Sequence, residues 1–389
     1  MRIGILTFHK AINYGAYLQA FSFSNKLKET FPDDEIEIID YIAPKERMRK
    51  FKIILWNLKH YGIKGCISEL KRNLIFNSMQ KYLSLSPKSF CTNNLKKLYK
   101  YIENRYDMLI IGSDAVFNWN QTDFPTAFIP DYEFSIPVYT YAASVHGMKF
   151  YSVKKNKIDI CSKIFERMTY VGTRDKCSEE FVKLCSQNAK IIHCCDPTLF
   201  IDKESIYEKG IIVSEKLDKR YGLSLKDKYI VVMAPDSELI KDIYKRYSKE
   251  YKIISVFVKS SFSDYYISDL NPFEWTVILK EASMVVTSYF HGTLLSLVQG
   301  TPAVVLDYSG YCDDKYEGKL KDLMITRLNL SELYFDKNDA ENFVNKVEFY
   351  NIADELLDGR YQERINDAVE KEKSALLQFL DLLKSTDKK

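Results

Sequence analysis

Four short polar segments directly follow apolar runs in this chain, and they hold the side chains best suited to bind an anion or to move a proton. These segments are Asn13-Tyr14-Gly15, Gly112-Ser113-Asp114, Thr173-Arg174-Asp175 and Ser288-Tyr289-Phe290-His291-Gly292-Thr293. In open parallel sheets, ligands bind beyond the carboxyl ends of the strands, where loops and helix starts gather. The four segments therefore predict one site that is assembled from distant parts of the sequence.

His291 is the most informative residue in these segments. It follows an apolar run that ends at Thr287, and we expect a helix to begin at Gly292 and Thr293. The free N–H groups and the dipole of a helix start attract anions, and a histidine beside them can exchange a proton near neutral pH. A structural histidine that caps the helix explains the position equally well. Gly292 favours a functional role, because glycine lets a ligand approach the backbone closely.

Arg174 and Asp114 offer two further functional groups. Arginine forks onto a carboxylate or a phosphate, but on spacing alone an ion pair with Asp175 or another acid is the better interpretation of Arg174. Asp114 could accept a proton from a sugar hydroxyl, or it could cap the next turn. The glycine turn at residues 13–15 resembles part of a nucleotide site. It lacks the full GxGxxG spacing, so we expect no dinucleotide cofactor.

Neither a metal nor an organic cofactor is expected. His193, Cys195 and Asp196 lie close together in the sequence, but they lack the separated second pair of ligands that a zinc site needs. None of the eight cysteines forms a CxxC pair.

Apolar runs and helical patterns alternate along the chain and must position these segments. Arg2–Phe8, Tyr106–Gly112 and Met284–Thr287 are short apolar runs typical of buried strands, and helical patterns separate such runs. This alternation predicts parallel, doubly wound sheets, and 389 residues are too many for one core. We therefore expect an α/β fold with two Rossmann-like domains that face a cleft. The expected divisions are residues 1–205, 206–335 and a C-terminal helical segment at 336–389.

A basic helical insertion is expected at about residues 45–105 of the first domain. This stretch holds 15 Lys and Arg against 3 Asp and Glu, a local charge of +12, whereas the whole chain carries +3. The asymmetry indicates an anionic partner. Residues 47–56 combine basic and aromatic side chains in a pattern that can lie on an anionic membrane surface. We favour a helix that packs its apolar face on the domain, and we hold peripheral membrane contact as the minority hypothesis.

The sequence predicts a cytoplasmic protein. The N-terminus runs directly into a strand pattern and lacks the layout of a signal peptide, and no stretch approaches the roughly 20 apolar residues of a membrane span. The cysteines are then expected to be reduced. An association with the inner face of the cell membrane is the alternative location. No nucleic acid partner is expected.

Several motifs, spread in order from residue 3 to about residue 323, together resemble the polysaccharide pyruvyl transferase family. They are Ile3–His9 with Asn13–Ala20, Asp107–Asn118 (DMLIIGSDAVFN), Tyr141–Ser144, Asp196–Leu199, Thr287–Gly292 (TSYFHG) and Gly300–Pro302. The chain departs from the family pattern at three positions. Ala115 and Phe117 replace a Gln and a Trp, and His146 stands where a glycine is more usual. These departures bear on the pocket of the first domain and on the acceptor.

The resemblance implies an architecture similar to the GT-B glycosyltransferases and a reaction that moves a pyruvyl group from phosphoenolpyruvate onto a sugar as a ketal. The acceptor would be a sugar of a bacterial surface polysaccharide or its lipid-linked oligosaccharide precursor. It also implies that His291 and Arg174 belong to the active site.

We assign His291 as the acid/base, Arg174 as an anion clamp and Asp114 as a weaker candidate base. The candidates for substrate binding are Asn13, Tyr14, Gly15, Ser113, Ser288, Gly292, Thr293 and Lys319, with the amides of Gly292 and Thr293 holding an anion. For Lys319, an ordinary surface lysine is the better interpretation. Two alternatives stay open: a nucleotide-sugar-dependent glycosyltransferase of the GT-B type, and a non-catalytic carbohydrate-binding relative.

Overall fold

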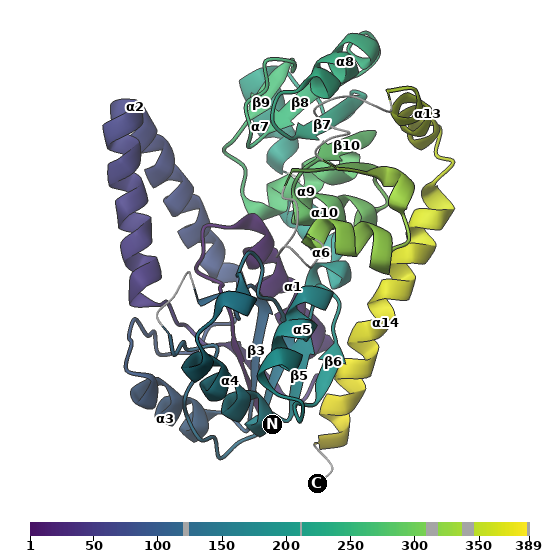
Figure 1. The fold of residues 1–389 in the computed structure, drawn as a ribbon. Coiled ribbons are helices and arrows are strands. Elements are labelled where there is room, and N and C mark those ends of the chain that lie inside the picture. Colours follow the sequence, from purple (N-terminus) through teal and green to yellow (C-terminus); the bar gives the residue numbers. More distant parts are fainter. Residues whose placement is uncertain (120–123, 211, 309–317, 337–345, 387–389) are drawn as a thin grey trace. The chain divides into compact units, whose positions relative to one another are not determined.

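The structure, a computed structural model, describes residues 1–119, 124–210, 212–308, 318–336 and 346–386 (Figure 1). Contacts divide the chain into two compact units. Unit 1 runs from Met1 to Phe200 and includes the C-terminal residues from Ala375 onward. Unit 2 comprises the described residues between Ile201 and Ser374. No helix among the described residues is long and apolar enough to span a membrane.

Unit 1 is built on a six-stranded sheet in the order β2-β1-β3-β4-β5-β6, and all of its pairings are parallel. Its strands are β1 (Arg2–Leu6), β2 (Glu35–Ile38), β3 (Met108–Asp114), β4 (Val138–Ala143), β5 (Tyr170–Thr173) and β6 (Ile191–His193). The central strands β3 and β4 are apolar and buried almost throughout. Helices that cover both faces explain this lack of alternation, because neither face of the sheet meets water.

The helices of unit 1 begin where side chains satisfy their free backbone N–H groups. The Asn13 side chain accepts from the amide of Ala16 at 3.1 Å and so begins α1 (Tyr14–Thr30). Asp175 caps α5 (Lys176–Cys185) in the same way, accepting from Ser178 N at 2.8 Å. The other helical elements are α2 (Pro44–Met79), η1 (Gln80–Tyr82), α3 (Leu95–Arg105), η3 (Phe150–Ser152), α4 (Lys155–Arg167) and η4 (Pro197–Phe200).

Unit 2 contains a second six-stranded parallel sheet, in the order β12-β11-β10-β7-β8-β9. Its strands are β7 (Tyr229–Met233), β8 (Lys252–Val256), β9 (Tyr265–Ile267), β10 (Met284–Thr287), β11 (Ala303–Asp307) and β12 (Tyr334–Asp336). Numbered within the unit, this is the order 3-2-1-4-5-6 of Rossmann domains. Its helical elements are α6 (Lys203–Gly210), α7 (Ile212–Tyr221), α8 (Glu238–Tyr247), α9 (Pro272–Glu281), α10 (Phe290–Gln299), α11 (Lys319–Lys321), η5 (Asp322–Arg327), η6 (Ser331–Leu333) and α13 (Lys346–Leu357).

The C-terminal segment does not form a body of its own. Its main element, α14 (Gln362–Thr386), is shared between the two units. In unit 1, the ring of Phe379 packs 4.9 Å from that of Tyr141 and 6.5 Å from that of Phe23. Residues 337–345, which the sequence interpretation included in this segment, lie outside the described residues.

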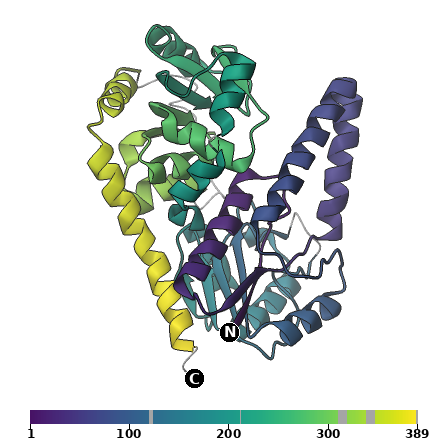
Figure 2. The same cartoon turned by 180° about the vertical axis from the view of Figure 1, so that it is seen from behind.

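The division between the two units falls at Phe200 and Ile201, close to the expected division at residues 205 and 206. The residues that follow form α6 and α7, and α6 packs on α9 so closely that a Cβ on Gly210 would lie 2.5 Å from Cγ2 of Val277. One expectation about local structure is corrected. The basic helix α2 does not pack its apolar face on the domain. Of its residues, only Glu46, Phe76 and Met79 are buried, and Figures 1 and 2 show that it folds back on itself and extends away from the sheet of unit 1.

Candidate functional site

The carboxyl ends of β1 and β3 form the point in unit 1 where the strand order reverses, which is where open sheets bind ligands. The predicted segment Gly112-Ser113-Asp114 lies there. The hydroxyl of Thr7, just after β1, donates to the carbonyl of Ser113 at the end of β3 over 3.5 Å. Ser113 is 1% exposed, and within the described part of the chain its Oγ has no hydrogen-bond partner. The Ser113 hydroxyl is therefore a buried polar group at this edge that the described contacts do not satisfy.

The loop from residue 13 to residue 15 offers fewer groups for substrate binding than the sequence suggested. The Asn13 side chain is committed to the α1 cap. Tyr14 is buried, with its ring 4.9 Å from that of Phe76, and Gly15 is buried within the first turn of α1. These positions begin a helix and anchor it, and this structural role requires no ligand.

Asp114 is held in an unusual backbone conformation. Its φ is 79°, in the left-handed region that few non-glycine residues adopt. Its carbonyl accepts from Val116 N at 2.7 Å and from Ser144 N at 2.9 Å, which ties the turn to the end of β4. The preceding Gly112 lies against β4, because a Cβ there would be 2.1 Å from the carbonyl oxygen of Tyr141. The half-buried Asp114 side chain is thus aimed by a tightly constrained turn.

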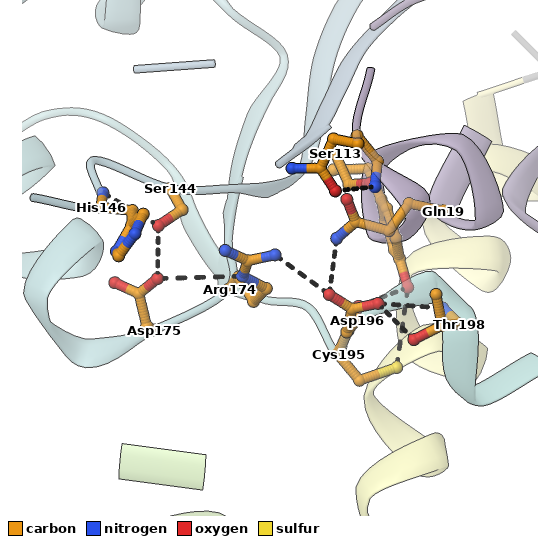
Figure 3. A network of polar contacts seen from close by, with 12 residues as sticks. Gln19, Ser113, Ser144, His146, Arg174, Asp175, Cys195, Asp196 and Thr198 are labelled. Carbon is orange, nitrogen blue, oxygen red and sulfur yellow. Dashed lines mark hydrogen bonds and ion pairs between the residues drawn. The ribbon is translucent and has the colours of Figure 1, made fainter. Parts of the chain in front are cut away.

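Arg174 lies in a buried polar network at the ends of β5 and β6 (Figure 3). It is 3% exposed, and its Nη1 donates to Asp196 Oδ2 at 3.0 Å. The same carboxylate oxygen accepts from Gln19 Nε2 at 2.6 Å, and the other oxygen accepts from the amide and the hydroxyl of Thr198 at 3.0 and 2.7 Å. The ion pair that spacing alone favoured is present, with Asp196 as its nearest acid.

A second branch of this network surrounds Asp175. Its Oδ2 lies 4.0 Å from Arg174 Nε and accepts from the hydroxyl of Ser144 at 2.7 Å. Its Oδ1 accepts from the amide and the hydroxyl of Ser178. The amide of His146 in turn donates to Ser144 Oγ at 3.2 Å. One guanidinium therefore bridges two carboxylates and orients the loops after β4, β5 and β6.

Gln19 and Ser144 belong to this network, although the sequence analysis noted them only for their places in family motifs. Gln19 lies on the inner face of α1, and its partner Asp196 is 177 residues away. No local pattern marks such a contact. The motif around Asp196, quoted only for its resemblance, was the one available signal.

Two of the departures from the family pattern, Ala115 and Phe117, lie in the core of unit 1, and the third, His146, touches this network through its backbone amide. Phe117 is 0% exposed, and its ring lies 5.2 Å from that of Phe165 and 6.3 Å from that of Phe181. Ala115 is also buried. His146 is half-buried, and its carbonyl accepts from Asn118 Nδ2 at 2.6 Å. The exchange of a Trp for Phe117 is therefore a change of packing.

In unit 2 the strand order reverses between β7 and β10, and His291 lies just beyond the end of β10. The amide and the hydroxyl of Ser288 both reach the carbonyl of Met233 at the end of β7, at 2.9 and 3.2 Å. Thr287 Oγ1 accepts from the amide of Tyr289 at 3.0 Å. These bonds join the two strand ends and direct the chain into α10, so Ser288 has a structural task here.

The start of α10 differs from the sequence expectation. The helix begins at Phe290, so the amide of Thr293 lies one full turn inside it and donates to the carbonyl of Tyr289 at 2.9 Å. Thr293 therefore cannot offer its N–H to an anion, and its hydroxyl donates to the same carbonyl at 3.1 Å. The first-turn amides are those of Phe290, His291 and Gly292. The expected pair of Gly292 and Thr293 is thus corrected to these three.

Gly292 is required by packing. A Cβ at this position would lie 2.7 Å from Thr287 Oγ1 and 2.8 Å from Met233 Cε. The sequence interpretation attributed this glycine to the close approach of a ligand. In unit 2 the close approach is that of α10 to the ends of β7 and β10.

Lys319 and His291 both lie near the aromatic ring of Phe290. The imidazole centroid of His291 is 5.2 Å from that of Phe290, and Lys319 Nζ is 5.3 Å from the same ring. Both residues are half-buried. Lys319 is therefore more than a solvated surface lysine, because its ammonium stands beside the positive end of the α10 dipole. Together they form an electropositive, N–H-rich corner at the carboxyl edge of the sheet.

No group of three or more metal-ligating side chains was found among the described residues. His193 and Cys195, considered for a metal above, belong to unit 1 near the network of Arg174. Cys195 is buried, and its carbonyl accepts from the hydroxyl of Tyr141 at 2.9 Å.

Comparison with solved structures supports the architecture. UDP-GlcNAc 2-epimerase from Neisseria meningitidis bound to UDP-GlcNAc is similar, with a TM-score of 0.52 and 11% identity, covering 99% of this chain and 100% of that chain. The UDP-GlcNAc 2-epimerase of Methanocaldococcus jannaschii has a TM-score of 0.53 and 9% identity, and the match covers 97% of this chain and 99% of that chain. Anabaena HepE in complex with UDP has a TM-score of 0.54 and 10% identity, and the match covers 99% of this chain and 100% of that chain. At these identities the likeness shows the fold alone, which is that of GT-B enzymes.

Sequence comparison identifies the family. A search of curated proteins found no match. A model of the polysaccharide pyruvyl transferase family matches residues 13–310, well over half of the chain. That range includes the network around Arg174 and the start of α10 with His291. This chain therefore belongs to the polysaccharide pyruvyl transferase family.

Proposed function

We propose that this protein transfers a pyruvyl group from phosphoenolpyruvate onto two hydroxyls of a sugar in a surface polysaccharide or its lipid-linked precursor. Family membership supports a transferase that acts on polysaccharide. The observation that carries the donor assignment is the corner formed by His291, Lys319 and the first turn of α10. Phosphoenolpyruvate carries a carboxylate and a phosphate, so it needs cations and N–H donors close to a group that can deliver a proton.

The proposed reaction begins with proton delivery to the methylene carbon of the donor. His291 gives this proton, the double bond supplies the electron pair, and the adjacent carbon becomes electrophilic. A sugar hydroxyl forms a bond to that carbon and loses its proton, and the phosphate leaves. A second hydroxyl of the same sugar then closes the ketal. His291 can take back a proton during these steps, so one imidazole serves as both acid and base.

The anionic groups of the donor are assigned to the first turn of α10. The amides of Phe290, His291 and Gly292 point out of the helix start, and Lys319 adds a full positive charge beside them. At the carboxyl edge of the unit 1 sheet, Ser113 is proposed as a polar contact and Asp114 as the base for the acceptor. Arg174 is assigned to hold the loops of that edge in position, through its ion pairs with Asp196 and Asp175.

A nucleotide-sugar-dependent glycosyltransferase is the second candidate. The similar solved structures include proteins bound to UDP-GlcNAc or UDP, and a helix start binds a diphosphate as readily as a phosphate ester. The choice between donors therefore rests on binding measurements. The Phe117 departure is a change of packing in the core of unit 1 and gives no support to a non-catalytic relative.

The test combines donor binding with a conservative change at His291. Calorimetry should detect phosphoenolpyruvate binding to wild type and to His291→Gln, whereas UDP-GlcNAc should not bind. In a deletion strain, wild type should restore the pyruvate ketal of the surface glycan by mass spectrometry. His291→Gln should lower the rate by about 10²- to 10⁴-fold, the usual contribution of acid–base catalysis. Binding of UDP-GlcNAc in place of phosphoenolpyruvate would support the second candidate, and a fully restored ketal would remove His291 from the mechanism.

A further inference from the structure

The hairpin formed by α2 exposes an unusual amount of apolar surface. It supplies eleven of the eighteen exposed large hydrophobic side chains among the described residues. They are Met48, Phe51, Ile53, Leu55, Trp56, Leu58, Tyr61, Ile63, Ile67, Leu70 and Leu74. Exposed apolar residues scattered singly need no explanation, but a continuous group of this size marks an interaction surface.

The exposed residues form ordered stripes on the two arms. Gly62, with φ 64° and ψ −159°, breaks α2 and lets the chain turn back, so that a Cβ on Gly65 would lie 3.0 Å from the carbonyl of Asn57. In the second arm, the spacing of the exposed residues puts one stripe on one face, made of Ile63, Ile67, Leu70 and Leu74. The first arm carries the equivalent stripe of Met48, Phe51, Leu55 and Leu58. Both stripes run to the turn at Gly62, so exposed apolar side chains continue to the tip of the hairpin.

The base of the hairpin is anchored on unit 1, and its tip is not. Near the base, Phe76 packs on Tyr14 with ring centroids 4.9 Å apart, and the hydroxyl of Tyr17 donates to the carbonyl of Met79 at 2.8 Å. At the tip, Tyr61 and Ile63 are 63% and 72% exposed. The hairpin is therefore a rigidly mounted arm that presents its apolar tip.

The positive charge of the hairpin favours an anionic partner. Residues 44–79 contain nine Lys and Arg and two Asp and Glu, a net charge of +7. Lys52 and Lys59 follow Met48 and Leu55 of the first stripe by one helical turn, and both lysines are exposed. In the second arm, Lys64 and Lys71 flank Ile67 in a similar way. Long lysine stems can lie along apolar surface while the ammonium groups reach anionic groups beside it.

The tip also carries the aromatic residues that prefer the boundary between lipid and water. Trp56 is 51% exposed, stacks on His60 at 4.3 Å and meets the ring of Tyr61 edge-on at 5.6 Å. Tryptophan and tyrosine favour this boundary because one part of each side chain is apolar and another is polar. We propose that the α2 hairpin docks the protein on an anionic lipid bilayer, with the tip around Trp56, Tyr61 and Ile63 entering the headgroup region.

A second copy of the chain is the competing occupant of these stripes. Two hairpins of charge +7 would repel each other unless anions intervened, whereas an anionic bilayer complements that charge. The proposal does not depend on the donor or on the chemistry at His291.

The test is co-sedimentation of the full chain with vesicles. Vesicles of phosphatidylcholine with phosphatidylglycerol should pellet the protein at low salt, and vesicles of phosphatidylcholine alone should not. Lys59→Glu with Lys64→Glu should weaken binding by about 30-fold or more, because each basic residue at an anionic surface contributes about fivefold. Lys226→Glu with Lys249→Glu, an equal charge change at exposed sites of unit 2, is the matched control and should bind as wild type does.

Tryptophan fluorescence adds an independent readout of the tip. Trp119 and Trp275 are buried, so a blue shift on adding anionic vesicles would report Trp56. Trp56→Phe should bind but lose the shift. Sedimentation velocity completes the test: a dimer that Trp56→Ala, Tyr61→Ser and Ile63→Ser together abolish, with no vesicle binding by wild type, would overturn the proposal. Failure to bind anionic vesicles at low salt would overturn it as well.

Discussion

The carboxyl edges of the two sheets use similar residue types in opposite ways. In unit 1, Arg174 is 3% exposed and bridges Asp196 and Asp175 within a closely bonded network. In unit 2, His291 and Lys319 are half-buried beside the start of α10. Buried, paired charges are costly to disturb and hold loops in place, whereas partly exposed groups at a helix start can meet a ligand. Arg174 therefore has the surroundings of a structural ion pair, whereas His291 and Lys319 have those that the proposed donor chemistry needs.

Removing the guanidinium of Arg174 is expected to give the largest loss of stability. Arg174→Ala leaves the carboxylates of Asp175 and Asp196 buried without their counter-charge, which costs about 3 to 5 kcal/mol. Urea unfolding measures this loss. The matched control is Arg167→Ala, because Arg167 is 41% exposed in its pair with Glu133, and such pairs contribute about 0 to 1 kcal/mol.

A test of Arg174 in donor binding needs a variant that does not unfold the protein. Arg174→Lys keeps one charge and should retain the fold, so calorimetry can measure its affinity for phosphoenolpyruvate. An Arg174→Ala protein as stable as wild type would contradict the structural role of this ion pair.

Adding a methyl group at each edge compares how tightly the two edges are packed, through the stability that each variant loses. Gly112→Ala places a Cβ 2.1 Å from a backbone oxygen and at a φ of 126°, so we expect a loss of about 3 kcal/mol or more. Gly292→Ala meets the flexible end of Met233 and the hydroxyl of Thr287, so a loss of about 1 to 2 kcal/mol is expected. Thermal unfolding of both variants shows which edge loses more stability on gaining a methyl group. The reverse order would show that the end of β10 is the more rigid one.

An effect of similar size that depends on pH concerns another paired carboxylate in unit 1, that of Asp40. Burial raises the pKa of Asp40, but hydrogen bonds from His9 and Lys10 outweigh it and hold that pKa at about 2. A lowered pKa contributes stability that is complete above the unfolded value near 4 and is lost as pH falls toward 2. Asp40→Asn should therefore cost about 1 to 2 kcal/mol at pH 7.

That cost should stay constant down to about pH 5 and shrink below pH 4. Urea midpoints at several pH values measure it, with the exposed Asp33→Asn as control. A difference between Asp40→Asn and wild type that grows as pH falls would contradict the assigned direction.

Much of the candidate site was predictable at the level of segments. The ends of β5 and β10 lie where the apolar runs predicted, and β3 extends two residues past its run to Asp114. A buried parallel strand needs an unbroken apolar run, and a polar loop must follow it. The helix start was missed by two residues, since Phe290 is apolar and resembles a continuation of the strand. Because of this shift, Phe290 and His291 replace Thr293 among the candidate amides for anion binding. The pairing of Gln19 with Asp196 had no local signal at all.

The sequence by itself determined the α/β class, the two parallel sheets and the family, because strand and helix periodicities and ordered motifs are local properties of the chain. Only the tertiary structure decided how each polar residue is used. Arg174 became a buried bridge because two acids, one of them Asp196 22 residues away, converge on it. The apolar residues of α2 stayed exposed because its arms turn away from the sheet of unit 1, and no periodicity reveals which surface a helix meets.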